Sequence, residues 1–370
     1  MRIALLEPFL TGSHKKWAEE FAQHSKHEIK IFSLSGHYWK WRMHGGAVSL
    51  ARKFLESNFQ PDVLLATDML DLSVFLGLTR SATHNIPSAI YFHENQLTYP
   101  WSSMDSDVRQ QRDNHYCFIN YTSALAADKV FFNSQYHFDS FFKELPVFLK
   151  AFPDNNESGS VENIKKKSSV LPLGMDLEKI QQLKPAEIKK EGRAVILWNH
   201  RWEYDKNPEA FFHALFELKE RGVEFKLVVL GESYESRPKI FDEAREKLKE
   251  NILHFGFAQD YAEYVQWLCK CDILPVTSVH DFFGTSVVEA MYCDVFPLLP
   301  KRLAYPEHIP QQLHYTFFYE DNEREFVNRL QRLIFDVKLP RGENVHQFVE
   351  QYDWRKMIER YDNEIHSLLR

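Results

Sequence analysis

Long apolar runs are missing from the sequence. None approaches the roughly 20 residues that a membrane-spanning helix needs, which argues against an integral membrane protein. Residues 1–6 do not have the layout of a secretory signal and run directly into an expected strand. The four cysteines do not suggest a disulfide framework, and Cys269 and Cys271 stand too close for a common zinc pair. We therefore expect buried, reduced thiols in a cytoplasmic protein with no membrane partner.

An excess of positive charge is also missing. The net charge of −7 argues against a protein that is basic all over, although a local basic face stays possible. Internal repeats and long low-complexity tracts are absent as well. What is present is a globular composition, 44% hydrophobic and 26% charged, in a chain of 370 residues. That length favours two domains.

Short apolar runs alternate with helical patterns along the chain, which is typical of α/β domains. We expect a first domain at 1–174 and a second at 175–352, followed by a C-terminal helix within 353–370. A polar segment at 154–169 is expected to be irregular.

Two cations follow the strand expected at 194–198. Arg201 and Lys206 stand in a polar loop that leads to a helix beginning at Pro208. The loop lies at the carboxyl end of a strand, where open α/β sheets bind ligands. The fork of an arginine and the point charge of a lysine suit a diphosphate. The alternative is a solvated loop whose cations face water.

A second strand end combines carboxylates with the start of a helix. Asp281 follows an expected strand, and Glu289 lies inside the helix expected from Thr285. Gly284 lets the backbone approach a ligand, and the first amides of the helix, at Thr285 and Ser286, point outward as donors to an anion.

The first domain has two comparable strand ends. At the first, Gly12 and Ser13 form a turn that can let the backbone approach a ligand or cap a helix; the alternative is an ordinary turn. At the second, His93, Glu94 and Asn95 follow a strand, and a histidine and a carboxylate in this position are candidates for a catalytic loop. The alternative there is a helix cap.

Aromatic rings alternate with cations in an arm at 37–46, before a helix expected at 47–58. Rings stack on bases and cations meet phosphates, so this mixture suits RNA. Between residues 15 and 53, eight Lys or Arg stand against three Glu, a local excess of five positive charges. Alternatively, the tryptophans pack on the domain and the charges are solvated. The candidates are Lys15, Lys16, Trp39, Lys40, Trp41 and Arg42.

Asp105 and Asp107 have the spacing of an acidic metal motif found in a different, metal-dependent transferase fold. They follow a Pro-Trp-Ser-Ser loop rather than a strand. We therefore do not expect a metal site there.

Together, Arg201, Lys206, Asp281 and Glu289 resemble the site of the retaining family 4 glycosyltransferases. That pattern is Glu, seven residues and Glu, with an Arg and Lys pair earlier in the same domain; here Asp281 takes the first acidic position. Five ordered segments also resemble the tRNA-queuosine α-mannosyltransferases: Gly-Ser-His-Lys (12–15), Trp-Lys-Trp-Arg (39–42), Phe-His-Glu-Asn-Gln-Leu (92–97), His-Arg-Trp-Glu-Tyr-Asp-Lys (200–206) and His-Asp-Phe-Phe-Gly (280–284).

The resemblance implies a GT-B fold, with two facing Rossmann-like doubly wound domains and a cleft between them. Residues 1–174 would bind the acceptor tRNA and 175–352 the nucleotide-sugar donor, while the helix within 353–370 would cross back to the first domain. The implied reaction transfers mannose from GDP-mannose to the cyclopentenediol of queuosine in tRNA-Asp. It would retain configuration and need no metal or other cofactor.

The resemblance also implies a role for each candidate. Arg201, Lys206 and the helix amides would stabilise the departing diphosphate. Glu289 would bind the ribose and Asp281 the transferred sugar, while His93 would orient the sugar or share the acceptor's proton. The donor set also contains Gly12, Ser13, Gly284, Thr285 and Ser286, and the tRNA set contains Lys15, Lys16, Trp39, Lys40, Trp41, Arg42, Glu94 and Asn95.

Two alternatives stay open. One is a GT-B transferase that uses another nucleotide sugar on a lipid or glycan acceptor. The other is a protein that binds a sugar nucleotide or RNA without transfer.

Overall fold

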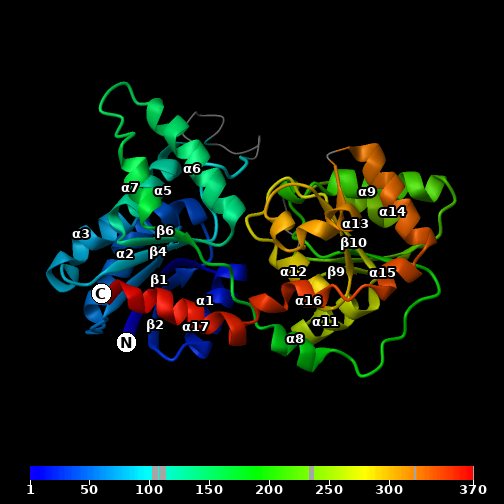
Figure 1. Cartoon of the computed structure of the whole chain (residues 1–370), viewed down its shortest axis with the longest axis horizontal. Helices are drawn as coiled ribbons and strands as arrows, with labels where there is room; N and C mark the ends of the chain where they lie inside the picture. Colours follow the sequence, from blue (N-terminus) through cyan, green and yellow to red (C-terminus); the bar gives the residue numbers. More distant parts are fainter. Residues whose placement is uncertain (102–106, 108–113, 233–236, 321, 370) are drawn as a thin grey trace. The chain divides into compact units, whose positions relative to one another are not determined.

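The computed structural model describes residues 1–370 except 102–106, 108–113, 233–236, 321 and 370. The chain forms two compact units (Figure 1). The first contains Met1–Met175 and Trp354–Arg370, and the second contains Asp176–Asp353. Within the described ranges, no helix has both the length and the apolar character needed to cross a membrane.

A six-stranded parallel sheet forms the centre of the first unit. Its strand order is β2-β1-β3-β4-β5-β6, so the direction of winding reverses between β1 and β3. Open α/β sheets bind ligands at the carboxyl ends of strands at such a switch point. The strands are β1 (Arg2–Leu10), β2 (Glu28–Ser35), β3 (Val63–Thr67), β4 (Ser88–Phe92), β5 (Lys129–Phe132) and β6 (Ser168–Val170).

Helices pack on this sheet around a core that includes Leu50, Phe75 and Phe132, all fully buried. They are α1 (Gly12–His24), α2 (Trp39–Glu56), α3 (Leu72–Thr83), α5 (Asn114–Ala126), α6 (Gln135–Lys150), α7 (Ser160–Lys166) and α17 (Trp354–His366). The C-terminal helix α17 is tied to α1, because Trp17 Nε1 donates to Tyr361 Oη at 3.1 Å.

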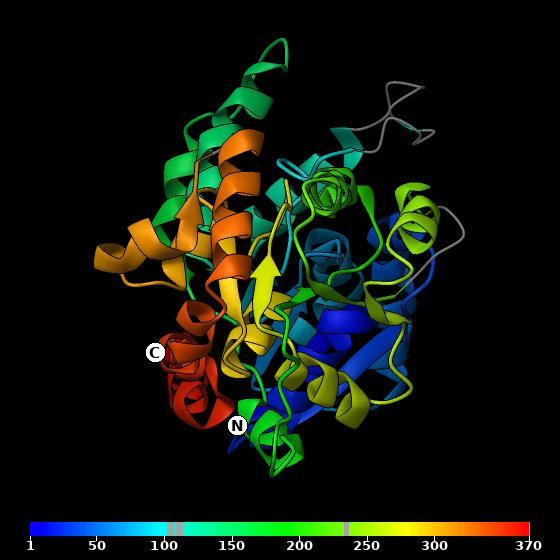
Figure 2. The ribbon, with the colours of Figure 1, turned by 90° about the vertical axis from the view of Figure 1, so that its right-hand side faces the viewer.

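The second unit repeats the architecture with the strand order β12-β11-β10-β7-β8-β9, and its switch point lies between β7 and β10. Helices cover both faces of this sheet, with α9, α10 and α14 on one face and α8, α11, α12 and α16 on the other (Figure 1, Figure 2). The strands are β7 (Val195–Trp198), β8 (Lys226–Leu230), β9 (Ile252–Gly256), β10 (Ile273–Pro275), β11 (Phe296–Pro300) and β12 (Phe318–Tyr319). The helices are α8 (Leu177–Leu183), α9 (Pro208–Glu220), α10 (Ile240–Lys247), α11 (Tyr261–Lys270), α12 (Thr285–Tyr292), α13 (His314–Phe317), α14 (Glu323–Phe335), α15 (Lys338–Gly342) and α16 (His346–Val349).

The prediction of a separate arm at 37–46 is wrong, because α2 already begins at Trp39. The glycine pair, which suggested a break, lies inside the helix. A Cβ on Gly46 would lie 2.9 Å from Pro8 Cβ, and a Cβ on Gly45 would lie 2.8 Å from the Trp41 ring. Gly46 therefore allows α2 to pack closely on β1, and Gly45 allows the Trp41 ring to pack on its own helix.

The polar segment expected to be irregular contains α7 and the strand β6. Ser168 pairs with Val130 of β5 along the edge of the sheet. An edge strand is held by backbone hydrogen bonds on one side only, so its side chains need not be apolar. This explains why the Lys-rich and Ser-rich sequence did not suggest a strand here.

Candidate functional site

The loops after β7 and β10 meet at the switch point of the second unit. Lys206, which ends the 3-10 turn η1 (Tyr204–Lys206), is only 9% exposed. Its Nζ donates to the backbone oxygen of His280 at 2.9 Å and to Asp281 Oδ2 at 3.3 Å, and it lies 3.2 Å from Asp205 Oδ2. The structure therefore brings together two predicted site residues that are 75 positions apart.

The pair Lys206–Asp281 is ionised at neutral pH. Burial favours the neutral carboxyl, but Lys206, His200 and His280 together outweigh this effect and lower the pKa of Asp281. Burial likewise opposes the charge of Lys206, yet Asp281 and Asp205 raise the pKa of that ammonium. Tyr305 Oη also donates to Asp281 Oδ2, at 3.2 Å. Asp281 is therefore held in place by two donors.

Arg201 has a different environment from Lys206. Its side chain is 49% exposed, and its Nη2 lies 3.1 Å from Glu203 Oε2. An exposed guanidinium can turn toward a phosphate at little cost in desolvation. The two cations of the loop are thus not equivalent.

Two tyrosines hold Glu289, which is buried in α12. Tyr261 Oη donates to Oε1 at 3.1 Å, and Tyr264 Oη donates to Oε2 at 2.9 Å. Neither tyrosine was selected from the sequence. Their spacing of three residues on α11 places both on one helix face, which is a signal that the sequence does contain.

The start of α12 depends on Gly284, whose φ of +89° lies in the left-handed region. A Cβ there would also lie 3.0 Å from Tyr305 Cε1, so a larger residue would be strained on both counts. Thr285 and Ser286 form the first turn of the helix. The Ser286 hydroxyl is hydrogen-bonded to His200 Nδ1 at 2.9 Å, which fixes this turn to the loop after β7.

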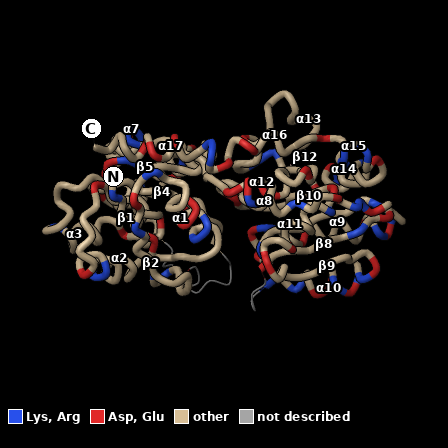
Figure 3. The backbone as a smooth tube through the Cα atoms, turned by 90° about the horizontal axis from the view of Figure 1, so that it is seen from below, with Lys and Arg blue, Asp and Glu red and all other residues tan. Residues whose placement is uncertain are grey.

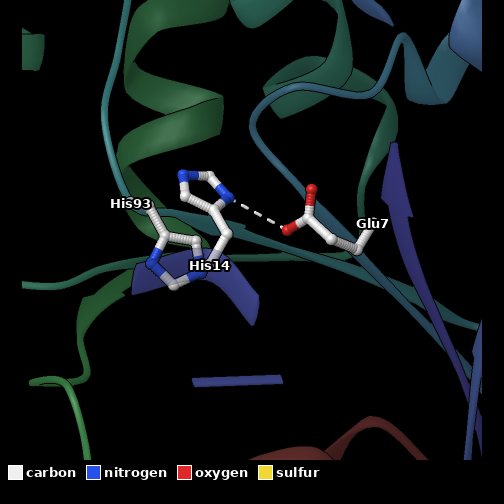
Figure 4. Close-up of side chains that lie close together, drawn as sticks. All are labelled: Glu7, His14 and His93. Atoms are coloured by element: carbon white, nitrogen blue, oxygen red, sulfur yellow. Dashed lines mark hydrogen bonds and ion pairs between the residues drawn. The ribbon is translucent and has the colours of Figure 1, made fainter. Parts of the chain in front are cut away.

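At the switch point of the first unit, three ionisable side chains lie together (Figure 4). Glu7 comes from β1, His14 from α1, and His93 from the end of β4. The distance between His14 Nδ1 and Glu7 Oε2 is 3.0 Å, and the two imidazole centroids are 4.3 Å apart. Asp68, directly after β3, accepts a hydrogen bond from the His93 amide at 2.8 Å.

Of this cluster, sequence reasoning selected only His93. A carboxylate inside an otherwise apolar strand, as at Glu7, and one directly after a strand, as at Asp68, were available signals. Burial opposes protonation of His14, but Glu7, with smaller contributions from Asp68 and Glu94, reverses this effect and raises the pKa of His14 to about 9. Burial raises the pKa of Asp68, His14 opposes that rise and Glu94 adds to it, so that the pKa of Asp68 reaches about 8.

These values predict that the stability of the first unit falls as the pH rises from about 6.5 to about 9. His14 has a pKa of about 9 in the folded chain, whereas its ordinary value is 6.5. The stabilisation that its protonation provides is therefore complete below pH 6.5 and is lost as the pH rises to about 9. The pKa of Asp68 rises from 3.8 to about 8 on folding, so ionisation of this carboxyl also lowers the stability as the pH rises. The His14 contribution is about 3 kcal/mol.

Urea unfolding near pH 6 and near pH 9 measures this difference. The variant His14→Asn should show a weaker pH dependence than the parent chain. A parent whose stability is flat or rises over this range would contradict the prediction.

The other predicted residues of the first unit lie in several environments. Gly12 and Ser13 form the exposed first turn of α1, together with Lys15. Gly12 has a φ of +51°, which favours glycine there. Asn95 is fully buried, and its Oδ1 accepts the Thr98 amide at 3.0 Å, so its side chain stabilises a turn rather than a helix start.

Within α2, the predicted RNA residues differ in exposure. Trp41 is 64% exposed, and Tyr38, which directly precedes α2, is 80% exposed. Trp39 packs on Tyr116, with ring centroids 5.1 Å apart. Lys40 pairs with Asp107 at 2.5 Å, and Asp105 lies outside the described residues. The remaining candidates are Arg42, which donates to Ser35, half-buried Lys16, and Glu94, which accepts from Gln96.

Comparison with known proteins identifies relatives of both units. A family model described as the N-terminal part of tRNA-queuosine alpha-mannosyltransferase matches residues 2–175, and the model of glycosyl transferases group 1 matches residues 179–350. A Drosophila melanogaster protein named tRNA-queuosine alpha-mannosyltransferase is 36% identical over 321 residues, which cover 85% of this chain and 83% of the relative.

Solved structures support the fold over the whole chain. Sucrose-phosphate synthase from Thermosynechococcus elongatus matches with a TM-score of 0.72 at 15% identity, covering 100% of this chain and 99% of that one. HepE from Anabaena in complex with UDP matches with a TM-score of 0.66 at 14% identity, covering 99% and 100%. The fold is therefore GT-B. The group 1 family model and the Drosophila relative show that the chain is a glycosyltransferase. From the sequence matches we conclude that the chain belongs to the tRNA-queuosine alpha-mannosyltransferase family.

Proposed function

We propose that this enzyme transfers mannose from GDP-mannose to the cyclopentenediol of queuosine in tRNA-Asp, in the cytoplasm and with retention of configuration. The observation that carries the transferase role is the ionised pair Lys206–Asp281 at the switch point of the second unit. The acceptor is inferred from the name of the Drosophila relative and of the N-terminal family model.

The donor side of the proposal uses the second unit. Arg201, Lys206 and the first amides of α12 stabilise the negative charge that develops on the diphosphate as the sugar bond breaks. Asp281, fixed by Lys206 and Tyr305, holds a hydroxyl of the sugar. Glu289, oriented by its two tyrosines, accepts hydrogen bonds from the ribose.

A direct test incubates the protein with labelled GDP-mannose and three acceptors: tRNA from queuosine-containing cells, tRNA from queuosine-deficient cells, and lipid extract. Label should appear only on the first tRNA, and mass spectrometry of its nucleosides should show queuosine plus one hexose. UDP-glucose serves as the control donor. Label on the lipid, or equal labelling of both tRNAs, would overturn the acceptor assignment.

Metal independence is a prediction of this assignment. Because Arg201 and Lys206 supply the positive charge that a metal supplies in other transferases, excess chelator should leave the rate unchanged. The rate of labelled transfer, measured before and after chelation, checks this. Loss of activity that manganese restores would contradict it and would make Asp107 a candidate ligand.

The acceptor side uses the first unit, where Tyr38 and Trp41 present exposed rings and Lys15 an exposed cation. Lys and Arg are interspersed with Asp and Glu over both units in Figure 3, so the proposal depends on this local combination rather than on overall charge. Phosphates meet the cations, and an unpaired base stacks on a ring.

Trp41→Ala should therefore weaken tRNA binding by about tenfold, since one stacked base contributes about 1–3 kcal/mol. The double variant Lys15→Ala, Lys16→Ala should reduce the salt slope of binding by roughly 0.7–0.9 for each phosphate that the lysines no longer neutralise. Binding isotherms at several salt concentrations measure both effects. Lys249→Ala, an exposed lysine of the second unit, is the matched control. Parent-like binding by all variants would exclude this surface.

A further inference from the structure

The two buried histidines of the first unit differ in their hydrogen bonding. Both oxygens of Glu7 are engaged: Oε1 accepts the Phe9 amide at 2.8 Å, and Oε2 lies 3.0 Å from His14 Nδ1. His93, in contrast, has a buried Nε2 with no hydrogen-bond partner among the described residues. All three side chains are at least nine-tenths buried.

The ring of His93 packs against three other rings. Its ring lies against those of His14, Trp17 and Tyr91, with centroid distances of 4.3, 4.7 and 4.9 Å. The plane of His14 is tilted by 39° to that of His93, so one imidazole covers the other (Figure 4). A charge on His14 therefore acts on His93 at close range.

We propose that His14, held as an imidazolium by Glu7, is a positioning residue that keeps His93 uncharged and its Nε2 available to a substrate hydroxyl. Two like charges at this distance in a buried site repel strongly, so only one ring carries a proton. Glu7 decides which one, because it contacts His14. Burial and the charge of His14 accordingly hold the pKa of His93 well below its usual value.

The inference rests on the proposed function, in which His93 contacts the sugar or the acceptor hydroxyl. A neutral imidazole can accept a hydrogen bond at one nitrogen, whereas an imidazolium can only donate. The Glu7–His14 pair would thus maintain the acceptor form of His93 through the physiological pH range. This role is distinct from that of His93 itself, because His14 acts through the neighbouring ring.

Other ionisable groups face the two rings from neighbouring elements. Glu94 stabilises the cation on His14 in addition to Glu7, and Asp68 does so when it is ionised. His137 of α6 opposes a second charge on His93. The hydroxyl of Tyr91 is occupied, since it interacts with Tyr361 Oη at 3.1 Å and donates to Leu171 O at 2.8 Å.

A metal ion is the competing interpretation of Glu7, His14 and His93, whose ligand atoms lie within 4.8 Å of one another. The geometry favours the cation. Both oxygens of Glu7 are already engaged, one with the Phe9 amide and the other with His14 Nδ1, which leaves neither carboxylate oxygen without a partner to offer a metal. The experiment below distinguishes the two interpretations.

The test measures the pKa of His93 by NMR of histidine-labelled protein without substrate, with the resonance assigned through His93→Gln. Three variants remove the cation in different ways. His14→Asn retains a donor to Glu7, His14→Phe retains the ring, and Glu7→Gln removes the charge that holds the proton. In each, the pKa of His93 should rise by roughly 1–3 pH units, the effect of losing a close like charge. Exposed His213 is the internal control.

The same variants should move the acidic limb of the kcat/KM profile toward higher pH, whereas a merely structural defect would lower activity at every pH. An unchanged pKa of His93 in the folded variants would overturn the inference, as would stoichiometric zinc in the parent that His14→Asn loses. Because the NMR measurement needs no turnover, it stands even if the proposed reaction is wrong. Absence of mannose transfer by the parent would instead refute the proposed function.

Discussion

Replacing Arg201 by alanine should lower turnover by roughly 10²-fold or more, the effect of losing one donor to developing charge. Its side chain is half exposed and pairs with Glu203 at 3.1 Å near the surface. We therefore expect the free energy of unfolding to stay close to that of the parent. Single-turnover rates with saturating donor, together with urea unfolding, measure the two quantities separately.

Lys206→Ala should lose activity to a similar extent and also lose stability. The substitution leaves Asp205 and Asp281, 1% and 16% exposed, without their shared cation. Breaking a buried ion pair from one side destabilises a protein by about 3–5 kcal/mol. The double variant Lys206→Ala, Asp281→Asn should recover part of this stability but none of the activity.

Loss of the exposed Arg201 and loss of the buried Lys206 should thus affect turnover alike but stability differently. Near-normal transfer by both single variants would exclude the diphosphate clamp. If Lys206→Ala unfolds at the same urea concentration as Arg201→Ala, the buried ion pair is not coupled to folding as described. Lys249→Ala serves again as the control for loss of a lysine charge.

Asp281→Asn and Glu289→Ala should separate sugar handling from nucleotide binding. Asp281→Asn should lower transfer by roughly 10²-fold, because the asparagine carries no charge to hold the sugar hydroxyl and the partner ammonium together. GDP should still bind. Glu289→Ala should weaken GDP binding by about tenfold or more, the effect of losing a charged hydrogen-bond acceptor.

Calorimetric titration of GDP against both variants distinguishes these roles. Tyr264→Phe is an informative companion, since it removes a 2.9 Å hydrogen bond to Glu289 without changing the charge. It should weaken GDP binding less than Glu289→Ala does. The assignment fails if Asp281→Asn abolishes GDP binding while Glu289→Ala retains it.

Local patterns in the sequence determined the alternation of strands and helices and placed the main candidates at strand ends. The strand before Arg201 and the turn at Gly284 could be predicted, because apolar runs and a glycine before a helix have local physical causes. Motif resemblance identified the family and the fold, which the comparisons support. Local patterns misjudged 37–46, where the fit of Gly46 against Pro8 outweighs the helix-breaking tendency of glycine.

Only the tertiary structure decided which ionisable groups meet. Lys206 contacts Asp281 across 75 positions because β7 and β10 are neighbours in the sheet, although two strands separate them in the chain. Likewise, His14 and His93 overlap because the carboxyl ends of β1 and β4 lie along one edge. Strand order depends on packing between distant segments, so spacing along the sequence does not reveal these contacts. The charges that meet in these contacts, acting against burial, then keep Lys206, Asp281 and His14 ionised.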